Sequence, residues 1–411
     1  MKISLMASTA ALALFTAGAA SAECGIAAGS VRILSNDFAA LHAVNDRALE
    51  CASDAVEVTT NATTEHKNIQ VAALTTEPAA YTVAIVANGS LVPLLNEGLV
   101  RPLDDLVAQY GQQLSPSQLI SIDGQIVAIA FMANTQHLHY RGDLFEANGI
   151  AAPASYEDLI AAAEVLRANG VSENALFLNL KPGWDLGEEF VNMYMGFGGE
   201  FFEAGSAVPA IQGEAGVNTL EMLASLTEYM SPEFITFNTE EALPLWQASE
   251  IAAMNQWGSR AAVTIDPAGA APEVAAATVL AAAPTVGGGT IPATTLWWDG
   301  FVIAKNASDE DAAASFQAMM HAISPELLVE HSSTAAWLID GYVPTPAAVG
   351  VFETVAGGAR PYPMVPYMGL LHTAIGDNLA EFLQGQESAE QALADAVAAY
   401  TVAATEAGFL Q

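Results

Sequence analysis

Six tryptophans are the residues of this chain best suited to contact a ligand directly. Most of them stand beside polar residues at breaks in the apolar pattern, where side chains are rarely part of a core. A tryptophan offers about 150–250 Å² of flat surface and loses few rotamers on binding. Neighbouring asparagine, glutamine and aspartate side chains can each hydrogen-bond two hydroxyl groups. The pattern predicts non-covalent binding. The tryptophans are Trp184, Trp246, Trp257, Trp297, Trp298 and Trp337.

Sequence motifs for catalysis or metal binding are not found. The chain has no Gly-x-Ser-x-Gly elbow, Walker loop, His-Glu-x-x-His or zinc-type spacing, so we expect no catalytic residue, cofactor or metal site. His137 and His139 would share one face of a strand, but no third ligand is evident. The adjacent acidic pairs Asp104-Asp105 and Glu188-Glu189 are expected to be solvated or to cap helices, because adjacent side chains point in different directions.

Polar residues that follow predicted strands are further binding candidates, because α/β sheets bind ligands at the carboxyl ends of their strands. Asp37 follows the first strand, where it also fits a helix N-cap. Glu65 and His66 follow the second strand, and Asn88 follows a buried apolar strand. Two more candidates, Asn134 and Gln136, lie further along the chain.

Short apolar strands alternate with helices, which predicts an α/β fold with largely parallel sheets. Strands are expected over 31–34, 56–59 and 81–86, and a helix over 38–49. A helix-rich middle runs to about 283, and a lone strand–helix unit begins at 298. Such a unit cannot bury both faces alone, so it is expected to join the first sheet. Serines followed three residues later by Asp or Gln mark helix starts at Ser155, Ser308 and Ser388.

The N-terminus has the pattern of a secretory signal peptide. Lys2 precedes a short apolar stretch that ends in Ala20-Ser21-Ala22, which predicts cleavage after Ala22 and a periplasmic location. About 390 residues remain, too many for one ordinary domain. Cys24 and Cys51 are the only cysteines, so in an exported protein they are expected to form one disulfide.

The charge of the chain excludes several classes of partner. Eleven Lys and Arg stand against 46 Asp and Glu, a formal net charge of −35. This argues against nucleic acid or an anionic membrane surface as a partner. It also disfavours strongly anionic ligands, unless a few arginines gather in one site.

Five segments in collinear order resemble the extracellular solute-binding proteins of carbohydrate ABC importers, the group that includes the maltodextrin-binding proteins. Departures from the family pattern include Ala130, where proline is usual, and Trp297-Trp298-Asp299, which replaces a glycine pair. The segments are LVPLLNEGLVRPLDDLV at 91–107, IDGQIVAIAFMANTQHLHYRGDLFEANGI at 122–150, APASYEDLIAAAEVL at 152–166, MNQWGSRAA at 254–262 and LWWDGFVIAKNASDEDAAASFQAM at 296–319.

The resemblance implies a type II-like periplasmic binding protein fold, in which two discontinuous α/β lobes meet at a hinge. The expected N-terminal lobe is 23–133 plus 284–335, and the expected C-terminal lobe is 134–283 plus 336–411, after a signal peptide at 1–22. The implied function is to bind a sugar, small oligosaccharide or polyol between the lobes and deliver it to an ABC permease, as a monomer and not as an enzyme. Two alternatives stay open: an anionic sugar derivative as the ligand, and a secreted carbohydrate-active enzyme.

The resemblance also selects site residues. Gln256 and Trp257 end a strand where the family's backbone enters the cleft. Asn134 and Gln136 lie on the first crossover between the lobes. Trp298, rather than Trp297, is expected to face the ligand. Trp184, Asp299 and Arg360 complete the set of candidates.

Overall fold

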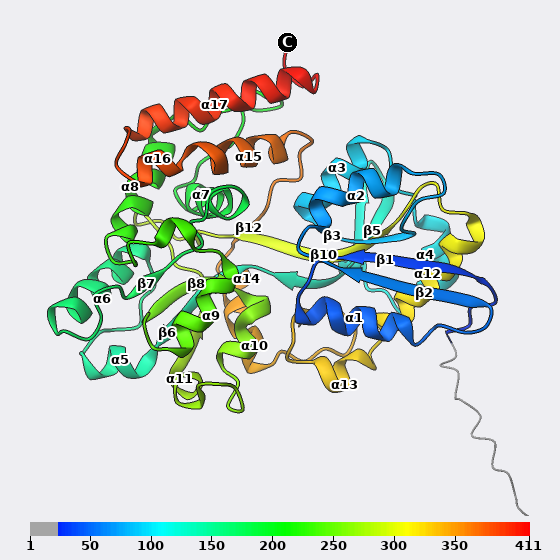
Figure 1. Ribbon diagram of the computed structural model, residues 1–411, viewed down its shortest axis with the longest axis horizontal. Helices are drawn as coiled ribbons and strands as arrows, with labels where there is room; N and C mark the ends of the chain where they lie inside the picture. Colours follow the sequence, from blue (N-terminus) through cyan, green and yellow to red (C-terminus); the bar gives the residue numbers. More distant parts are fainter. Residues whose placement is uncertain (1–23) are drawn as a thin grey trace, which may run out of the picture.

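The first sheet begins with three parallel strands in the computed structural model, which describes residues 24–411 (Figure 1). Strand β1 (Gly29–Ser35) pairs with β2 (Val56–Ala62) and with β3 (Val83–Ala87). β3 is buried along nearly its whole length, as its apolar run predicts. A helix follows each strand: α1 (Ala39–Leu49), α2 (His66–Thr75) and α3 (Asn88–Asn96).

Later strands return to this sheet and complete it. Its order is β11-β5-β10-β3-β1-β2, with β4 beside β5 and β12 beside β10, so the late strand–helix unit joins the first sheet as predicted. β10 lies antiparallel between β3 and β5. The remaining elements are η1 (Pro116–Gln118), β4 (Leu119–Ile122), β5 (Gln125–Asn134), β10 (Thr295–Ile303), β11 (Ala336–Trp337), β12 (Arg360–Pro361), α4 (Asp104–Tyr110), α12 (Asp309–Ala322) and α13 (Leu327–His331).

The second sheet has the order β7-β8-β6-β9 and lies in the other half of the molecule (Figure 1). Its strands are β6 (Gln136–Arg141), β7 (Leu176–Phe177), β8 (Ala253–Trp257) and β9 (Thr278–Ala281). The helices around it are α5 (Gly142–Ala147), α6 (Tyr156–Ala168), α7 (Trp184–Gly196), α8 (Glu214–Thr227), η2 (Phe234–Thr236), α9 (Thr239–Gln247), η3 (Gly258–Arg260), α10 (Ala261–Thr264), α11 (Pro272–Ala277), η4 (Pro346–Ala348), α14 (Val349–Ala356), α15 (Met368–Asn378), α16 (Ala380–Leu383) and α17 (Ala389–Glu406).

The predicted helix starts are found at all three serines. The Ser155 hydroxyl accepts a hydrogen bond from the Asp158 backbone N–H, and the Asp158 carboxylate accepts one from the Ser155 backbone N–H. At Ser308 only half of this box forms, because Asp311 accepts instead from the backbone N–H of Ser30 in β1. The carboxylate thus links the start of α12 to the first strand.

Two separate hydrophobic cores underlie the two halves, which we call the N-lobe (first sheet and its helices) and the C-lobe (second sheet and its helices). The expected lobe limits at 284 and 336 differ by a few residues from the limits that the two hydrophobic cores indicate. Val286 and Ala293 pack in the C-lobe core, whereas Trp337 and Ile339 pack in the N-lobe core. We propose that the chain crosses near Thr135, within β10 and after Ile339.

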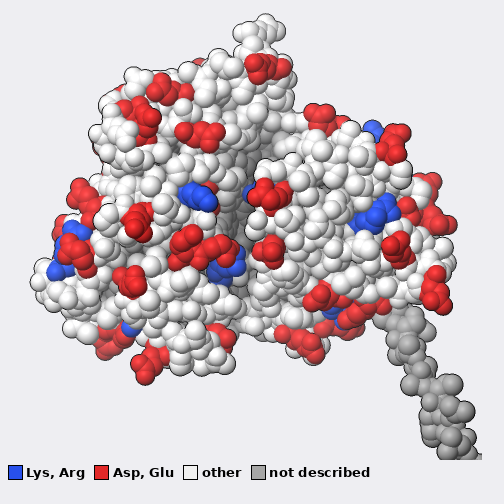
Figure 2. All heavy atoms as spheres, viewed as in Figure 1, with Lys and Arg blue, Asp and Glu red and all other residues white. Residues whose placement is uncertain are grey.

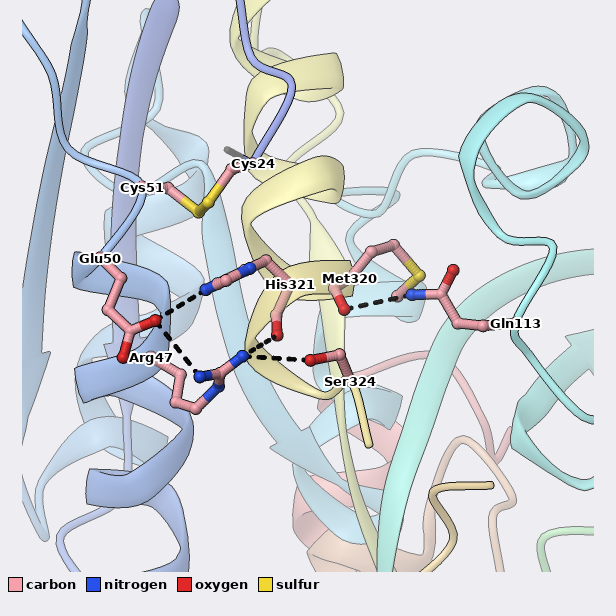
Figure 3. Close-up of a disulfide and its surroundings, with 8 residues drawn as sticks. All are labelled: Cys24, Arg47, Glu50, Cys51, Gln113, Met320, His321 and Ser324. Carbon is pink, nitrogen blue, oxygen red and sulfur yellow. Dashed lines mark hydrogen bonds and ion pairs between the residues drawn. A yellow bond between two sulfur atoms is a disulfide. The ribbon is translucent and has the colours of Figure 1, made fainter. Parts of the chain in front are cut away.

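The predicted disulfide is confirmed. Cys24 and Cys51 are bonded with their Cα atoms 5.5 Å apart, which ties the segment before β1 to the end of α1 (Figure 3). Donor atoms of His321 and both cysteines lie within 4.8 Å of one another, but the two sulfurs are bonded to each other. His321 pairs instead with Glu50, at 2.8 Å. The group is therefore a structural link between α1 and α12.

None of the helices within 24–411 combines the length and apolar character needed to cross a bilayer. The signal peptide predicted for 1–22, with its cleavage after Ala22, lies outside the described residues.

Candidate binding site between the lobes

A groove runs between the two lobes, with acidic side chains on both sides of it (Figure 2). Two helix starts meet there. Lys67, in the first turn of α2, extends from the N-lobe, and its Nζ lies 3.9 Å from the ring centroid of Trp184, at the start of α7 in the C-lobe. This is a cation–π contact across the groove.

Trp184 belongs to an aromatic cluster that also contains Trp257, Trp297, Tyr362 and His372. Its ring stacks on Trp257 at 6.0 Å between centroids and meets the edge of Trp297 at 5.8 Å. Trp297 in turn lies 4.3 Å from Tyr362. The cluster draws side chains from α7, β8, β10, the segment after β12 and α15, so it forms only when all five are packed together.

A short hydrogen-bond chain fixes the position of Trp184. His372 Nε2 lies 2.9 Å from the Trp184 carbonyl, which can only accept, so this nitrogen carries the proton. Tyr362 then donates its hydroxyl hydrogen to His372 Nδ1, at 3.0 Å. Burial lowers the pKa of His372 to about 4, which keeps the imidazole neutral.

A hydrogen bond to Glu188 holds the Trp297 side chain in place. Its Oε1 accepts hydrogen bonds from Trp297 Nε1 at 2.9 Å and from Thr295 Oγ1 at 2.7 Å, while its buried Oε2 has no partner among the described residues. Burial raises the pKa of Glu188 to about 8. The neighbouring Glu189 accepts from Asn179, and burial raises its pKa to about 7.

The expectation that Glu188 and Glu189 are solvated or cap a helix is therefore wrong. Both lie in α7, which is buried on every side from Leu186 to Gly196. The other pair, Asp104-Asp105, is exposed in the first turn of α4, as expected.

Lys67, which lies over Trp184, and Asp299, two residues after Trp297 on β10, are partly buried ionisable side chains. Neither forms a hydrogen bond or an ion pair within the described chain. Burial lowers the pKa of Lys67, and the nearby Glu188, Asp299 and Asp185 oppose that effect. Burial raises the pKa of Asp299 to about 7, against the pull of Lys67. The two groups are thus close enough to influence each other and retain free hydrogen-bonding capacity.

Two predicted polar residues, Asn88 and Asn134, form hydrogen bonds with backbone groups. Asn88 is fully buried, donates to the Leu296 carbonyl and accepts from the Trp298 N–H. Asn134 accepts from the N–H groups of Thr135 and Ser259 at the crossover.

Two predicted site residues, Gln136 and Gln256, lie on the neighbouring strands β6 and β8 of the C-lobe sheet. Gln136 accepts from the side-chain amides of Asn192 and Asn255. Gln256 accepts from the Trp257 N–H, and its own buried side-chain amide nitrogen has no partner among the described residues.

Three other predicted residues, Asp37, Glu65 and Arg360, form contacts with neighbouring side chains. Asp37 pairs with His42 at 2.7 Å and caps no helix, since α1 has no side-chain cap. Glu65 accepts from Asn68. Arg360 pairs with Glu200 at 3.0 Å and donates to two backbone carbonyls, while its buried Nε has no partner among the described residues.

Histidines 66, 137 and 139 are all buried. Burial lowers the pKa of His66 to about 4, and its Nδ1 has no partner within the described residues. His137 and His139 share one face of β6, as their spacing predicts, with their rings stacked at 4.5 Å. Within 24–411 they belong to no group of three metal-ligating side chains.

The two adjacent tryptophans of β10 point to opposite faces, as alternation predicts, and the expectation that Trp298 faces the ligand stays a prediction. Trp297 joins the aromatic cluster, whereas Trp298 packs against the N-lobe core. Sequence reasoning also missed Lys67, Tyr362 and His372. The one available signal was that Lys67 is one of only four lysines and directly follows the predicted His66.

Comparison with known proteins identifies the family. The model of the bacterial extracellular solute-binding protein family matches residues 54–320, well over half of the chain. The chain is a bacterial extracellular solute-binding protein. This membership agrees with the expectation of a binding protein and not an enzyme. Among curated protein sequences, none matches the chain significantly.

Solved structures show the same two-lobed fold as this solute-binding protein. Maltose-bound MalE3 of T. maritima is 18% identical with a TM-score of 0.78, over 92% of this chain and 100% of that chain. A solute-binding protein of Agrobacterium vitis S4 with bound D-mannitol is 20% identical with a TM-score of 0.75, over 93% and 100%. One of Agrobacterium radiobacter K84 in complex with ribitol is 19% identical with a TM-score of 0.75, over 91% and 98%. The predicted periplasmic binding protein fold is confirmed.

Proposed function

We propose that this solute-binding protein is the substrate-binding component of an ABC importer and binds a sugar, small oligosaccharide or polyol in the groove between its lobes. The observation that carries the proposal is the aromatic cluster beside two charged side chains that make no hydrogen bond within the described chain. Aromatic rings complement the C–H face of a carbohydrate, and Lys67 and Asp299 supply a donor and an acceptor for its hydroxyl groups.

The ligands of the fold neighbours support this class. The three structures named above contain maltose, ribitol and D-mannitol, all uncharged polyhydroxylated molecules. The alternative of an anionic sugar derivative depended on Arg360, whose guanidinium pairs with Glu200. An uncharged ligand is therefore the better supported of the two.

Delivery to a permease follows from the two-lobed architecture. A ligand that contacts both lobes binds the closed arrangement better than the open one, so it shifts the population toward closure. We propose that a membrane permease recognises this closed form, outside the cytosol and with the binding protein as a monomer.

A thermal-shift screen of purified protein against neutral sugars, oligosaccharides and polyols tests the proposal, followed by calorimetry on each compound that raises Tm. We expect one site per chain with micromolar affinity, about −8 kcal/mol. Incubation with the same oligosaccharides, analysed for cleavage products, is the control for enzyme activity. A panel without any binder, or with cleavage products, contradicts the proposal.

A further inference from the structure

The disulfide lies beside a third side chain that can bind a metal ion. A ring nitrogen of His321 and the sulfurs of Cys24 and Cys51 all lie within 4.8 Å of one another (Figure 3). Within residues 24–411 they are the one such group of three metal-ligating side chains. Thiolates and imidazole are ligands that Zn²⁺ prefers in proteins. The bond between the sulfurs occupies both of them, so a metal can bind here only in the thiol form of the protein.

His321 is held in this position by contacts that do not involve the disulfide. Arg47 of α1 donates to the His321 carbonyl at 3.3 Å and to the Ser324 hydroxyl at 3.1 Å. Glu50 pairs with Arg47 at 3.3 Å and with His321 Nε2 at 2.8 Å. These contacts connect the end of α1 to the end of α12. Because Cys51 directly follows Glu50, we expect His321 to stay beside Cys51 when the two cysteines are thiols.

The contact with Glu50 also prepares the imidazole of His321 for a metal ion. An ionised carboxylate can only accept a hydrogen bond, so Nε2 of the neutral ring carries the proton and donates it to Glu50. The lone pair is then on Nδ1. A carboxylate that accepts from the other ring nitrogen orients a metal-bound histidine and raises its basicity.

Little movement is needed to admit a zinc ion. Two sulfurs on a tetrahedral zinc ion, each at about 2.3 Å from it, are about 3.8 Å apart. Rotation about the Cα–Cβ bond of Cys24 can separate the sulfurs in this way while the two Cα atoms stay 5.5 Å apart. Cys24 and His321 both line a surface cavity of about 560 Å³, through which an ion can enter. A water molecule from this cavity can occupy the fourth coordination position.

We propose that Cys24, Cys51 and His321 bind one zinc ion in the thiol form of this protein, with water as the fourth ligand. Cysteines are incorporated as thiols, so the chain has this form before the disulfide is made. Zinc displaces the two thiol protons and ties the segment before β1 to α1 and α12, as the disulfide does in the oxidised protein. The site lies outside the aromatic cluster, and the inference does not rest on the proposed function.

Metal titration of the protein in both redox forms tests the proposal. A water-soluble phosphine reduces the disulfide: the phosphine becomes its oxide with the oxygen of a water molecule, and the two sulfurs take up the two protons of that water. We expect the reduced protein to bind one Zn²⁺ per chain in competition with a chromophoric chelator. With Co²⁺ it should show a thiolate charge-transfer band and the visible bands of four-coordinate cobalt. The oxidised protein has the same surface carboxylates and should show neither band.

Three variants separate the proposed ligands from nonspecific binding. Glu50→Gln keeps all three ligands and should weaken Zn²⁺ binding by about tenfold in the reduced protein. His321→Ala removes a ligand and should weaken it further. His42→Ala is the matched control, because His42 also pairs with a carboxylate, that of Asp37 at 2.7 Å, and it should leave the affinity unchanged. Zn²⁺ should raise the Tm of the reduced wild-type protein more than that of reduced His321→Ala.

A reduced protein without a thiolate band in the presence of Co²⁺, or a His321→Ala protein that binds Zn²⁺ as tightly as wild type, overturns the inference. Circular dichroism of the reduced protein without metal shows whether it is folded. If it is unfolded, Zn²⁺ is expected to restore the fold, and a chain that stays unfolded with Zn²⁺ overturns the inference as well.

Discussion

At the scale of single residues, Trp184 is the exposed part of the aromatic cluster and the best candidate for stacking on a ligand. It is 37% exposed, whereas Trp297 beneath it is 6% exposed. Trp297 therefore acts mainly as support, held by Glu188, and Trp184 offers the accessible face. Lys67 lies over that face of Trp184, so a sugar ring that stacks there must lie beside Lys67 or displace it.

Trp184→Ala is expected to weaken carbohydrate binding at least tenfold, about 1.4 kcal/mol, because it removes the accessible ring. Trp298→Phe is the matched control, since Trp298 packs against the N-lobe core and should leave affinity nearly unchanged. Calorimetry on both variants measures the difference. Equal affinity losses, or a larger loss in Trp298→Phe, contradict the assignment of Trp184.

The raised pKa of Glu188 predicts that the stability of the folded protein depends on pH. Burial raises its pKa from 4.5 to about 8, so the folded state favours the protonated carboxyl. The stability from this preference is fully present below about pH 4.5 and is lost as the pH rises through about 8. Glu188→Gln does not titrate and keeps an acceptor for Trp297. We expect its Tm to fall less than that of wild-type protein between about pH 5 and pH 8, and identical slopes would count against a protonated Glu188.

Sequence reasoning succeeded at residues whose role is local. The caps at Ser155, Ser308 and Ser388 form because a serine hydroxyl bonds a backbone N–H three residues away. The role of Glu188 depends on Trp297, far along the chain, so no local pattern indicates that it is buried. Alternation placed Trp297 and Trp298 on opposite faces but carries no information on which face meets the other lobe.

At the scale of elements, the contact between α7 and α15 determines where the aromatic cluster lies. Gly376 of α15 approaches the start of α7 so closely that a Cβ there would lie 1.9 Å from the Gly183 carbonyl oxygen. His372, one turn earlier, holds the Trp184 carbonyl. The position of the Trp184 ring is thus set by how closely the two helices approach each other.

Gly376→Ala is expected to destabilise the protein by about 1–3 kcal/mol, because the added methyl group pushes α15 away from α7. Gly369→Ala is its control on the same helix, where a Cβ meets nothing within 4 Å. That change should be neutral or stabilise by up to about 1 kcal/mol through helix propensity. Chemical unfolding of both variants is the measurement. A Gly376→Ala protein as stable as Gly369→Ala would show that the close approach is unimportant.

The disulfide acts on another element and should affect stability alone. It closes a sequence separation of 27 residues between Cys24 and Cys51, worth about 3 kcal/mol in the chain-entropy model. The double variant Cys24→Ser/Cys51→Ser should unfold at lower temperature and bind carbohydrate with unchanged affinity, because the bond lies outside the aromatic cluster. A matching loss of affinity would mean that the N-terminal link also shapes the groove.

At the scale of the whole molecule, the fold was more predictable than the site. Strand–helix alternation and the collinear family segments were sufficient to predict two lobes and the return of β10 to the first sheet. The groove depends on side chains from both lobes, such as Lys67 and Trp184, which are distant in sequence. Their meeting is set by how the lobes pack, and hydrophobic periodicity reports only on each lobe's own core.

The net charge of −35 also acts on the whole molecule. Acidic side chains are spread over both lobes on the face that Figure 2 shows. The acidity therefore serves solubility and steers anions away.

The most direct test of this account is a crystal structure of the protein with the tightest-binding compound of the carbohydrate screen. The account predicts an uncharged sugar or polyol between the lobes, stacked on Trp184 and hydrogen-bonded to Lys67 and Asp299. A ligand bound outside the groove, or one in the groove that touches none of these three side chains, would contradict it.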